Sequence, residues 1–151
     1  MKFPTLLRVF ILTAATPLLM DPVSAGPLDA HRGASRLTVL SMPEGSSAEK
    51  LSQTLLTRKR EIEERDLKII DVSKGQHRIA TALRPADGQT NAIRKQLSIG
   101  VGETRPVFIL IGKDGGEKAR CHDALDLEKW FTLIDAMPMR RAEIQDQTKS
   151  R

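Results

Sequence analysis

The feature that most constrains the fold is an apolar run followed by a tight turn and an alternating segment. Val107–Ile111 is an unbroken series of β-branched, aromatic and aliphatic residues, typical of a strand buried on both faces. Residues 113–116 contribute aspartate and glycine, which tolerate the backbone conformations of a tight hairpin turn. In residues 117–121, small residues alternate with Lys118 and Arg120, as expected of a half-exposed edge strand. The sequence therefore predicts a β-hairpin that joins a buried strand to a charged edge.

The N-terminus has the order of a secretory signal peptide. Residues 1–8 are basic, residues 9–20 are mostly apolar, and small residues follow up to Ala25. We therefore expect residues 1–25 to be a signal peptide, cleaved between Ala25 and Gly26, and the mature protein to be periplasmic or extracellular. The alternative is a membrane anchor, but a span needs about 20 apolar residues and Pro17 interrupts this run. We expect no membrane span after signal removal.

The mature chain is expected to contain one domain. A chain of this length can bury a core without a metal ion or a disulfide. We expect residues 26–35 to be a flexible leader, residues 36–138 the folded domain and residues 139–151 a polar C-terminal tail. The whole sequence carries a net charge of +5, and its single cysteine, Cys121, excludes an internal disulfide.

The first half of the domain has the pattern of a βαβ unit. Strands are predicted at 36–41 and 67–72, joined by a helix that starts at a capping box of Ser46 and Glu49 and runs to about residue 65. A helical connection between adjacent strands indicates parallel strands. The charge run at 58–65 could be an anion-binding face, but its i,i+4 pairs favour a solvated helix end.

The second half supplies the remaining elements. Residues 73–89 are predicted to be a loop with at most one short extra strand, and residues 91–98 a short helix. A last helix is predicted from an N-cap at Asp126 to Pro138, which ends it. Its apolar stripe is typical of core packing and consists of Leu127, Trp130, Phe131, Ile134 and Met137.

The predicted order is β-α-β-α-β-β-α, with the last two strands forming the hairpin. This order is that of a thioredoxin-like α/β fold. We expect a four-stranded mixed sheet with helices on both faces, and the second strand of the hairpin at an edge.

Two motifs carry a resemblance to a known family. Residues 112–120, GKDGGEKAR, and residues 127–140, which end in IDAMPMR, resemble the signature of a bacterial secreted family of domains of unknown function. That family is related to the DUDES-type domains of sushi-repeat and coiled-coil matrix proteins. The resemblance covers roughly residues 36–144. It implies a thioredoxin-like, peroxiredoxin-related fold and supplies no activity.

Thiol chemistry at the usual position of this fold is excluded by the sequence. Dithiol enzymes carry Cys-x-x-Cys at the start of the first helix, where the helix dipole lowers the pKa of the attacking thiol. Residues 44–48 occupy that position here and contain no cysteine, which also excludes peroxidase chemistry there. Pro106 lies where thioredoxin-like proteins hold a cis-proline, and the sequence leaves both its isomers open.

Cys121 is the only candidate for catalysis, and the neighbouring His122 and Asp123 make it resemble a catalytic group. Consecutive strand residues point to opposite faces, so the thiol and the imidazole are not expected to share a proton. An ordinary thiol is only a few per cent thiolate at neutral pH. A partly buried bystander, or an adventitious disulfide-linked dimer, is the favoured interpretation.

No cofactor or metal site is predicted. The three histidines, His31, His77 and His122, are scattered and lack metal-ligand spacing. Residues 113–116 resemble a phosphate-binding loop only in composition, because they open no helix.

Two function hypotheses follow. The first is an exported, non-catalytic module that binds an unknown protein or an envelope polymer, with Pro106, Lys113 and Asp114 as a candidate binding surface and a monomer or weak dimer as the expected state. The second is an atypical single-cysteine redox protein that uses Cys121. Export and the scarcity of aromatic residues disfavour nucleic acid, although a basic surface could hold polyanions such as lipopolysaccharide or acidic glycans. A concave pocket between Pro106 and the loops at 42–47 and 73–89 is the geometry that would favour binding.

Overall fold

The predicted hairpin forms one side of the sheet. In the computed structural model, which describes residues 26–46, 48–75 and 78–149, β4 (Val107–Ile111) pairs antiparallel with β5 (Glu117–His122). All five residues of β4 are buried, and β5 lies at an edge of the sheet. The prediction of a buried strand joined to a charged edge is confirmed.

The centre of the sheet is β1 (Arg36–Ser41), whose residues are all buried. It pairs parallel with β2 (Leu67–Asp71), as the βαβ pattern predicts, and antiparallel with β4. The strand order is β3-β2-β1-β4-β5. The sheet is therefore mixed, as expected.

In the part of the chain that the structure describes, the sheet has five strands, and the prediction of four is wrong. The additional strand, β3 (Ala82–Leu83), pairs parallel with Ile69 and Ile70 of β2. Two residues are too few to show the alternation by which a strand is recognised in a sequence. The loop predicted at residues 73–89 therefore contains the second edge of the sheet.

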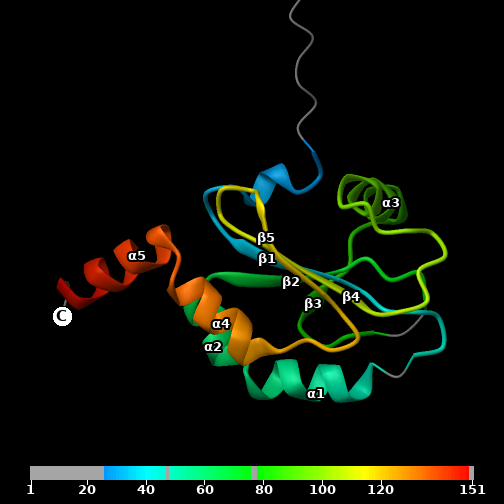
Figure 1. Cartoon of the computed structure of the whole chain (residues 1–151), viewed down its shortest axis with the longest axis horizontal. Helices are drawn as coiled ribbons and strands as arrows, with labels where there is room; N and C mark the ends of the chain where they lie inside the picture. The colour runs from blue at the N-terminus through cyan, green and yellow to red at the C-terminus, as the bar shows by residue number, and fades with distance from the viewer. Residues whose placement is uncertain (1–25, 47, 76–77, 150–151) are drawn as a thin grey trace, which may run out of the picture.

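Helices cover both faces of the sheet (Figure 1). On one face, α3 (Asp87–Gln96) packs through Ile93 and through its C-cap residue, Leu97. These two side chains form a cluster with Leu37, Val39 and Ile109. On the other face, α1 (Glu49–Thr57), α2 (Lys59–Glu64) and α4 (Leu127–Asp135) pack in a second cluster around Leu40, Phe108 and Leu110. Neighbouring strand residues alternate between the two clusters, as the pleat of a strand requires.

The single helix predicted between β1 and β2 is two helices. The backbone departs from helical values at Arg58, with φ −100° and ψ 13°, which separates α1 from α2. The predicted capping box is also wrong: the N-cap of α1 is Ala48, and no side chain caps it. The Ser46 N–H instead donates to the carbonyl of Pro43, so Ser46 belongs to a turn.

Both ends of the domain are more structured than the sequence suggests. In the leader expected to be flexible, Leu28 is buried in the α3-side cluster and is followed by the short 3-10 helix η1 (Asp29–His31). The segment expected to be a polar tail forms α5 (Pro138–Lys149), which begins at Pro138, whereas α4 has already ended at Asp135. Figure 1 shows α5 projecting beyond the sheet.

The predicted start of α4, at an N-cap of Asp126, is correct. The Asp126 carboxylate accepts a hydrogen bond from the Lys129 N–H, and Trp130 and Phe131 are buried in the core.

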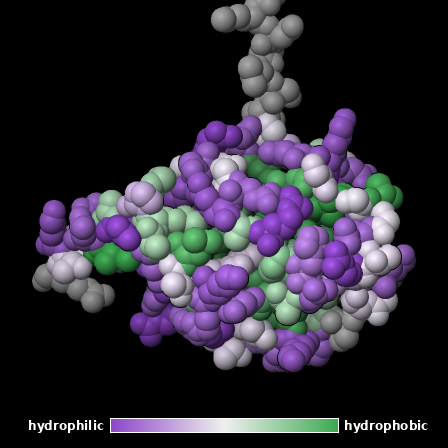
Figure 2. All heavy atoms as spheres, in the orientation of Figure 1, coloured by the Kyte–Doolittle hydropathy of each residue, from purple (hydrophilic) through white to green (hydrophobic). Residues whose placement is uncertain are grey.

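Hydrophilic residues cover most of the face shown in Figure 2. Among the described residues no helix is long and apolar enough to cross a membrane. Residues 1–25, including the expected signal peptide, lie outside the described part of the chain.

Candidate functional site

A hollow of about 380 Å³ opens at the carboxyl end of β1, beside α3. In open α/β sheets, ligands bind preferentially at the carboxyl ends of strands. We call this feature the Arg94 hollow; it is lined by Ser41, Met42, Pro43, Glu44, Lys74, Arg94, Val101, Gly102, Glu103 and Thr104. It involves the loops that follow β1 and β2, but Pro106 does not line it.

The walls of the Arg94 hollow are fixed by hydrogen bonds between these loops. The Met42 N–H donates to the Ser73 hydroxyl at 2.8 Å, and the Ser73 N–H donates to the buried Asp71 carboxylate at 2.9 Å. Arg84 donates to the carbonyls of Ser73 and Gly75. The loops after β1 and β2 are thus held together, which gives the hollow a defined shape.

Arg94 forms the floor where these segments meet. Its side chain, only 6% exposed, donates from Nη1 to the Ser41 hydroxyl and the Val72 carbonyl, and from Nη2 to the Gly100 carbonyl. Its Nε is buried and has no hydrogen-bond partner in the described structure. Burial lowers the pKa of the guanidinium, although the charge of Glu103 acts in the opposite direction. A buried cation therefore faces a hollow.

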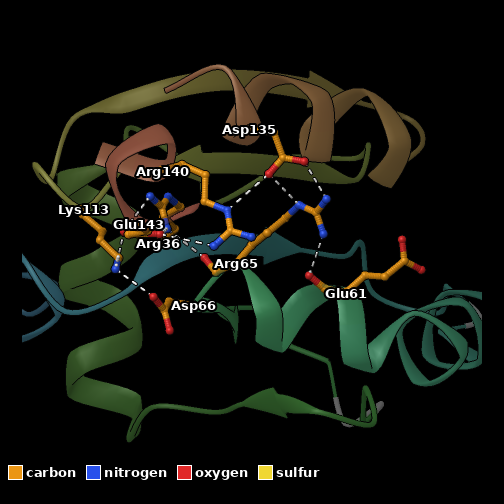
Figure 3. A network of polar contacts seen from close by, with 8 residues as sticks. All are labelled: Arg36, Glu61, Arg65, Asp66, Lys113, Asp135, Arg140 and Glu143. Atoms are coloured by element: carbon orange, nitrogen blue, oxygen red, sulfur yellow. Dashed lines mark hydrogen bonds and ion pairs between the residues drawn. The ribbon is translucent and has the colours of Figure 1, made fainter. Parts of the chain in front are cut away.

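Two other arginines of the described residues are buried, and both belong to a separate polar network (Figure 3). Arg36, 1% exposed, donates to both carboxylate oxygens of Glu143, at 3.2 and 3.1 Å. Arg140 lies 3.4 Å from the Asp135 carboxylate and 3.5 Å from that of Glu143. These contacts attach α5 to β1 and α4, which indicates a structural role.

The candidate binding residues Pro106, Lys113 and Asp114 lie around β4, away from the Arg94 hollow. Lys113 lies in the hairpin turn and binds Asp66 at 2.8 Å and Glu143 at 2.7 Å. Asp114, in the same turn, accepts hydrogen bonds from Lys118 and from the Gly116 N–H. Pro106 precedes β4 and the turn follows it, so the strand separates the two. Pro106 and the two turn residues therefore lie at opposite ends of β4.

Pro106 has a trans peptide bond, because no cis bond occurs in the described chain. Its carbonyl accepts a hydrogen bond from the Asp123 N–H at 3.3 Å, which closes the end of the hairpin. The proline thus supports the strand pair and does not line the hollow.

Cys121 is a free, half-buried thiol that lies apart from the Arg94 hollow. It pairs with Phe108 across the hairpin and packs against the cluster that α1 and α4 share, whereas Arg94 belongs to α3 on the other face. Its Sγ lies 3.4 Å from the Ala124 carbonyl. Burial raises the pKa of the thiol, and the carboxylates of Asp126 and Asp123 raise it further, against the effect of Lys129. This is the opposite of the shift that activates a catalytic thiol.

The described residues also offer no group of three or more histidine, cysteine, aspartate or glutamate side chains that could hold a metal ion. His77 lies outside the described residues.

Sequence reasoning missed Arg94. The available signal was its position in a predicted amphipathic helix, immediately after Ile93 and three residues before Leu97, both of which are buried. A charged residue beside the apolar stripe of a short helix is a candidate for burial, because residues three and four apart share a face.

Comparison with solved structures supports the fold. A reduced 2-Cys peroxiredoxin of Plasmodium vivax is 16% identical, with a TM-score of 0.56, and the alignment covers 81% of this chain and 72% of that one. The mitochondrial 2-Cys peroxiredoxin of Plasmodium falciparum is 11% identical, with a TM-score of 0.51 and coverages of 81% and 83%. At these identities the similarity shows a thioredoxin-like fold alone.

Comparison of the sequence gives one family. A profile described as Domain of unknown function (DUF4174) matches residues 27–143. No curated protein matches the chain in sequence.

Proposed function

Since the chain belongs to the DUF4174 family, whose description assigns no activity, we propose a function from its own geometry: a non-catalytic thioredoxin-like module that binds a ligand in the Arg94 hollow. The ligand is a protein or another component of the cell envelope. The proposal includes export by the N-terminal signal and a relationship to the DUDES-type domains that residues 112–120 and 127–140 resemble.

One observation carries the proposal. The sequence has a single cysteine, and it lies on the face of the sheet opposite α3, while the carboxyl end of β1 holds a preformed hollow with a buried arginine. The fold has therefore kept a concave site near the start of its first helix without the sulfur that redox chemistry needs there. A shaped hollow with a few convergent polar groups is the usual form of a binding site.

Photocrosslinking tests the binding function. Val101 is 80% exposed at the rim of the Arg94 hollow, and Met139, on α5, is also exposed but does not line the hollow. A photoreactive amino acid at position 101 should crosslink a discrete species in an envelope extract, and excess unlabelled protein should compete with it. The same group at position 139 is the matched control. Equal labelling at both positions, or none at position 101, would contradict the proposal.

The alternative redox function is tested on the Cys121 thiol. Because burial raises its pKa, we expect iodoacetamide to alkylate it more slowly than free cysteine at neutral pH, and we expect no insulin reduction or peroxide consumption. Fast alkylation, together with turnover that is lost in Cys121→Ser, would establish the redox function instead. Turnover that persists in Cys121→Ser would contradict both hypotheses.

A further inference from the structure

We propose that the Arg94 hollow binds the carboxylate of an acidic peptide side chain, with Arg94 and Lys74 as its cationic partners. This inference rests on the proposed binding function and names its ligand class. It follows from the contrast between the three buried arginines and from the composition of the hollow.

The buried arginines differ in their acceptors. Arg36 and Arg140 each reach a carboxylate, whereas Arg94 donates only to a hydroxyl and two carbonyls and forms no ion pair among the described residues. A buried charge without an opposite charge beside it is unfavourable in a protein interior. A carboxylate supplied by a ligand would provide the partner that the chain itself does not.

Arg94 also has donors to spare. A guanidinium carries five N–H groups in a fixed planar fork. Three of them bind Ser41, Val72 and Gly100, and the buried Nε–H has no hydrogen-bond partner in the described structure. Carboxylates are the acceptors best matched to this geometry, because both of their oxygens can accept from one guanidinium.

The other residues of the hollow indicate the rest of the ligand. Lys74 is exposed and places a second cation on its wall, while Met42, Pro43 and Val101 offer apolar contacts for a short aliphatic chain. This combination suits a glutamate or aspartate side chain better than a sugar, which would present hydroxyl groups to those apolar surfaces.

Glu44 and Glu103 are the acidic groups that line the hollow, and their charges oppose an incoming carboxylate. Glu103 forms no ion pair with Arg94; its carboxylate accepts from the Arg105 N–H at 3.4 Å. Its charge nevertheless acts on Arg94 through space. Removing that charge should therefore strengthen carboxylate binding, whereas removing Lys74 should weaken it.

The experiment is a titration of the isotopically labelled full chain with glutarate, followed by NMR. We expect saturable shifts of the Arg94 Nε–H signal and of the amides of residues 101–104, and none with neutral glutaramide. Lys74→Met should weaken glutarate binding about three- to tenfold, and Glu103→Gln should tighten it. Lys95→Met is the matched control: Lys95 is exposed on the same helix as Arg94, lies outside the hollow, and should leave binding unchanged.

Arg94→Lys keeps the charge but loses the fork, and should weaken binding further. Because Arg94 also supports the loops, the fold of the Arg94→Lys variant is checked by thermal unfolding. If that variant is unstable, the Lys74 and Glu103 variants decide whether the hollow binds a carboxylate. Equal binding by the wild type, Lys74→Met and Glu103→Gln would overturn the proposal. So would glucuronate binding more tightly than an end-blocked Ala-Glu-Ala peptide, which would assign the site to an acidic glycan.

Failure of this inference is distinguishable from failure of the binding function. If no carboxylate gives saturable shifts while position 101 still crosslinks a discrete species, the ligand class is wrong and the module still binds. If both experiments fail, the proposed function fails with the inference.

Discussion

Gly115 closes the hairpin turn with a φ of +81°, a left-handed conformation that L side chains rarely adopt. A methyl group there would also lie 2.9 Å from the guanidinium carbon of Arg32. We expect Gly115→Ala to lower the free energy of unfolding by about 1 kcal/mol or more. Urea unfolding is measured by the fluorescence of the only tryptophan, Trp130, which is 2% exposed.

Gly88 provides the control, because it lies in α3 with open space around it. Gly88→Ala should leave stability unchanged or raise it by up to about 0.5 kcal/mol, since alanine favours the helix. An equal loss in the two variants would show that the turn conformation is not the cause.

At the scale of single residues, the candidate site was only partly predictable from the sequence. The lack of a thiol at residues 44–48 and the isolation of Cys121 follow directly from counting cysteines. The sequence could mark Arg94 only as a candidate for burial, because the Val72 and Gly100 carbonyls that bind its side chain meet it only in the folded chain. The partners of Lys113 and Asp114, which are Asp66, Glu143 and Lys118, likewise meet them only in the folded chain.

Among the elements, α4 shows the clearest link from sequence to stability. Asp126 caps it by accepting from the Lys129 N–H at 3.0 Å, one of the helix's otherwise unpaired donors. We expect Asp126→Ala to lower the free energy of unfolding by about 1 kcal/mol, in urea unfolding followed by Trp130. Asp126→Asn should stay close to the wild type, because asparagine caps as well as aspartate. A loss of the same size in both variants would point to the charge and not to the cap.

Other element boundaries depend on tertiary contacts that periodicity does not report. Apart from Thr57, the residues around the break between α1 and α2 are good helix formers. The backbone nevertheless turns at Arg58, whose guanidinium binds Glu61 and Glu128 and lies over the Phe131 ring, 5.2 Å from its centre. The two residues of β3 become a strand only because β2 lies beside them. Whether a segment is a helix or a strand was therefore predictable where its apolar pattern is long. The residues at which the helices and strands begin and end were not.

At the scale of the whole molecule, Glu143 joins the C-terminal helix to the centre of the sheet. Its partner Arg36 is 107 residues away in sequence, and a further partner, Lys113, lies in the hairpin turn. No local pattern could reveal these pairs, which is why α5 was expected to be a polar tail. The apolar clusters follow from the sequence, whereas the ionic contacts that position α5 come from the tertiary fold.

This network predicts how stability depends on pH. Burial alone would raise the pKa of Glu143, but hydrogen bonds from Arg36 and Lys113 outweigh it and lower the pKa to about 2, from an ordinary value of 4.5. Folding therefore favours the ionised carboxylate. Its contribution is complete above about pH 5 and is lost as the pH falls toward about 2. Over this range we expect the wild type to lose about 1 to 3 kcal/mol more free energy of unfolding than Glu143→Gln.

The measurement is urea unfolding at a series of pH values, with Trp130 fluorescence as the signal. Near neutral pH, Glu143→Gln should be the less stable protein, because Arg36 then remains buried beside a neutral amide. Glu63→Gln is the control: its carboxylate is exposed and paired only with Lys59 at 3.7 Å, so its pH profile should follow that of the wild type. If Glu143→Gln kept the acid sensitivity of the wild type, carboxylates elsewhere would be responsible, and Glu143 would not be what ties α5 to the sheet.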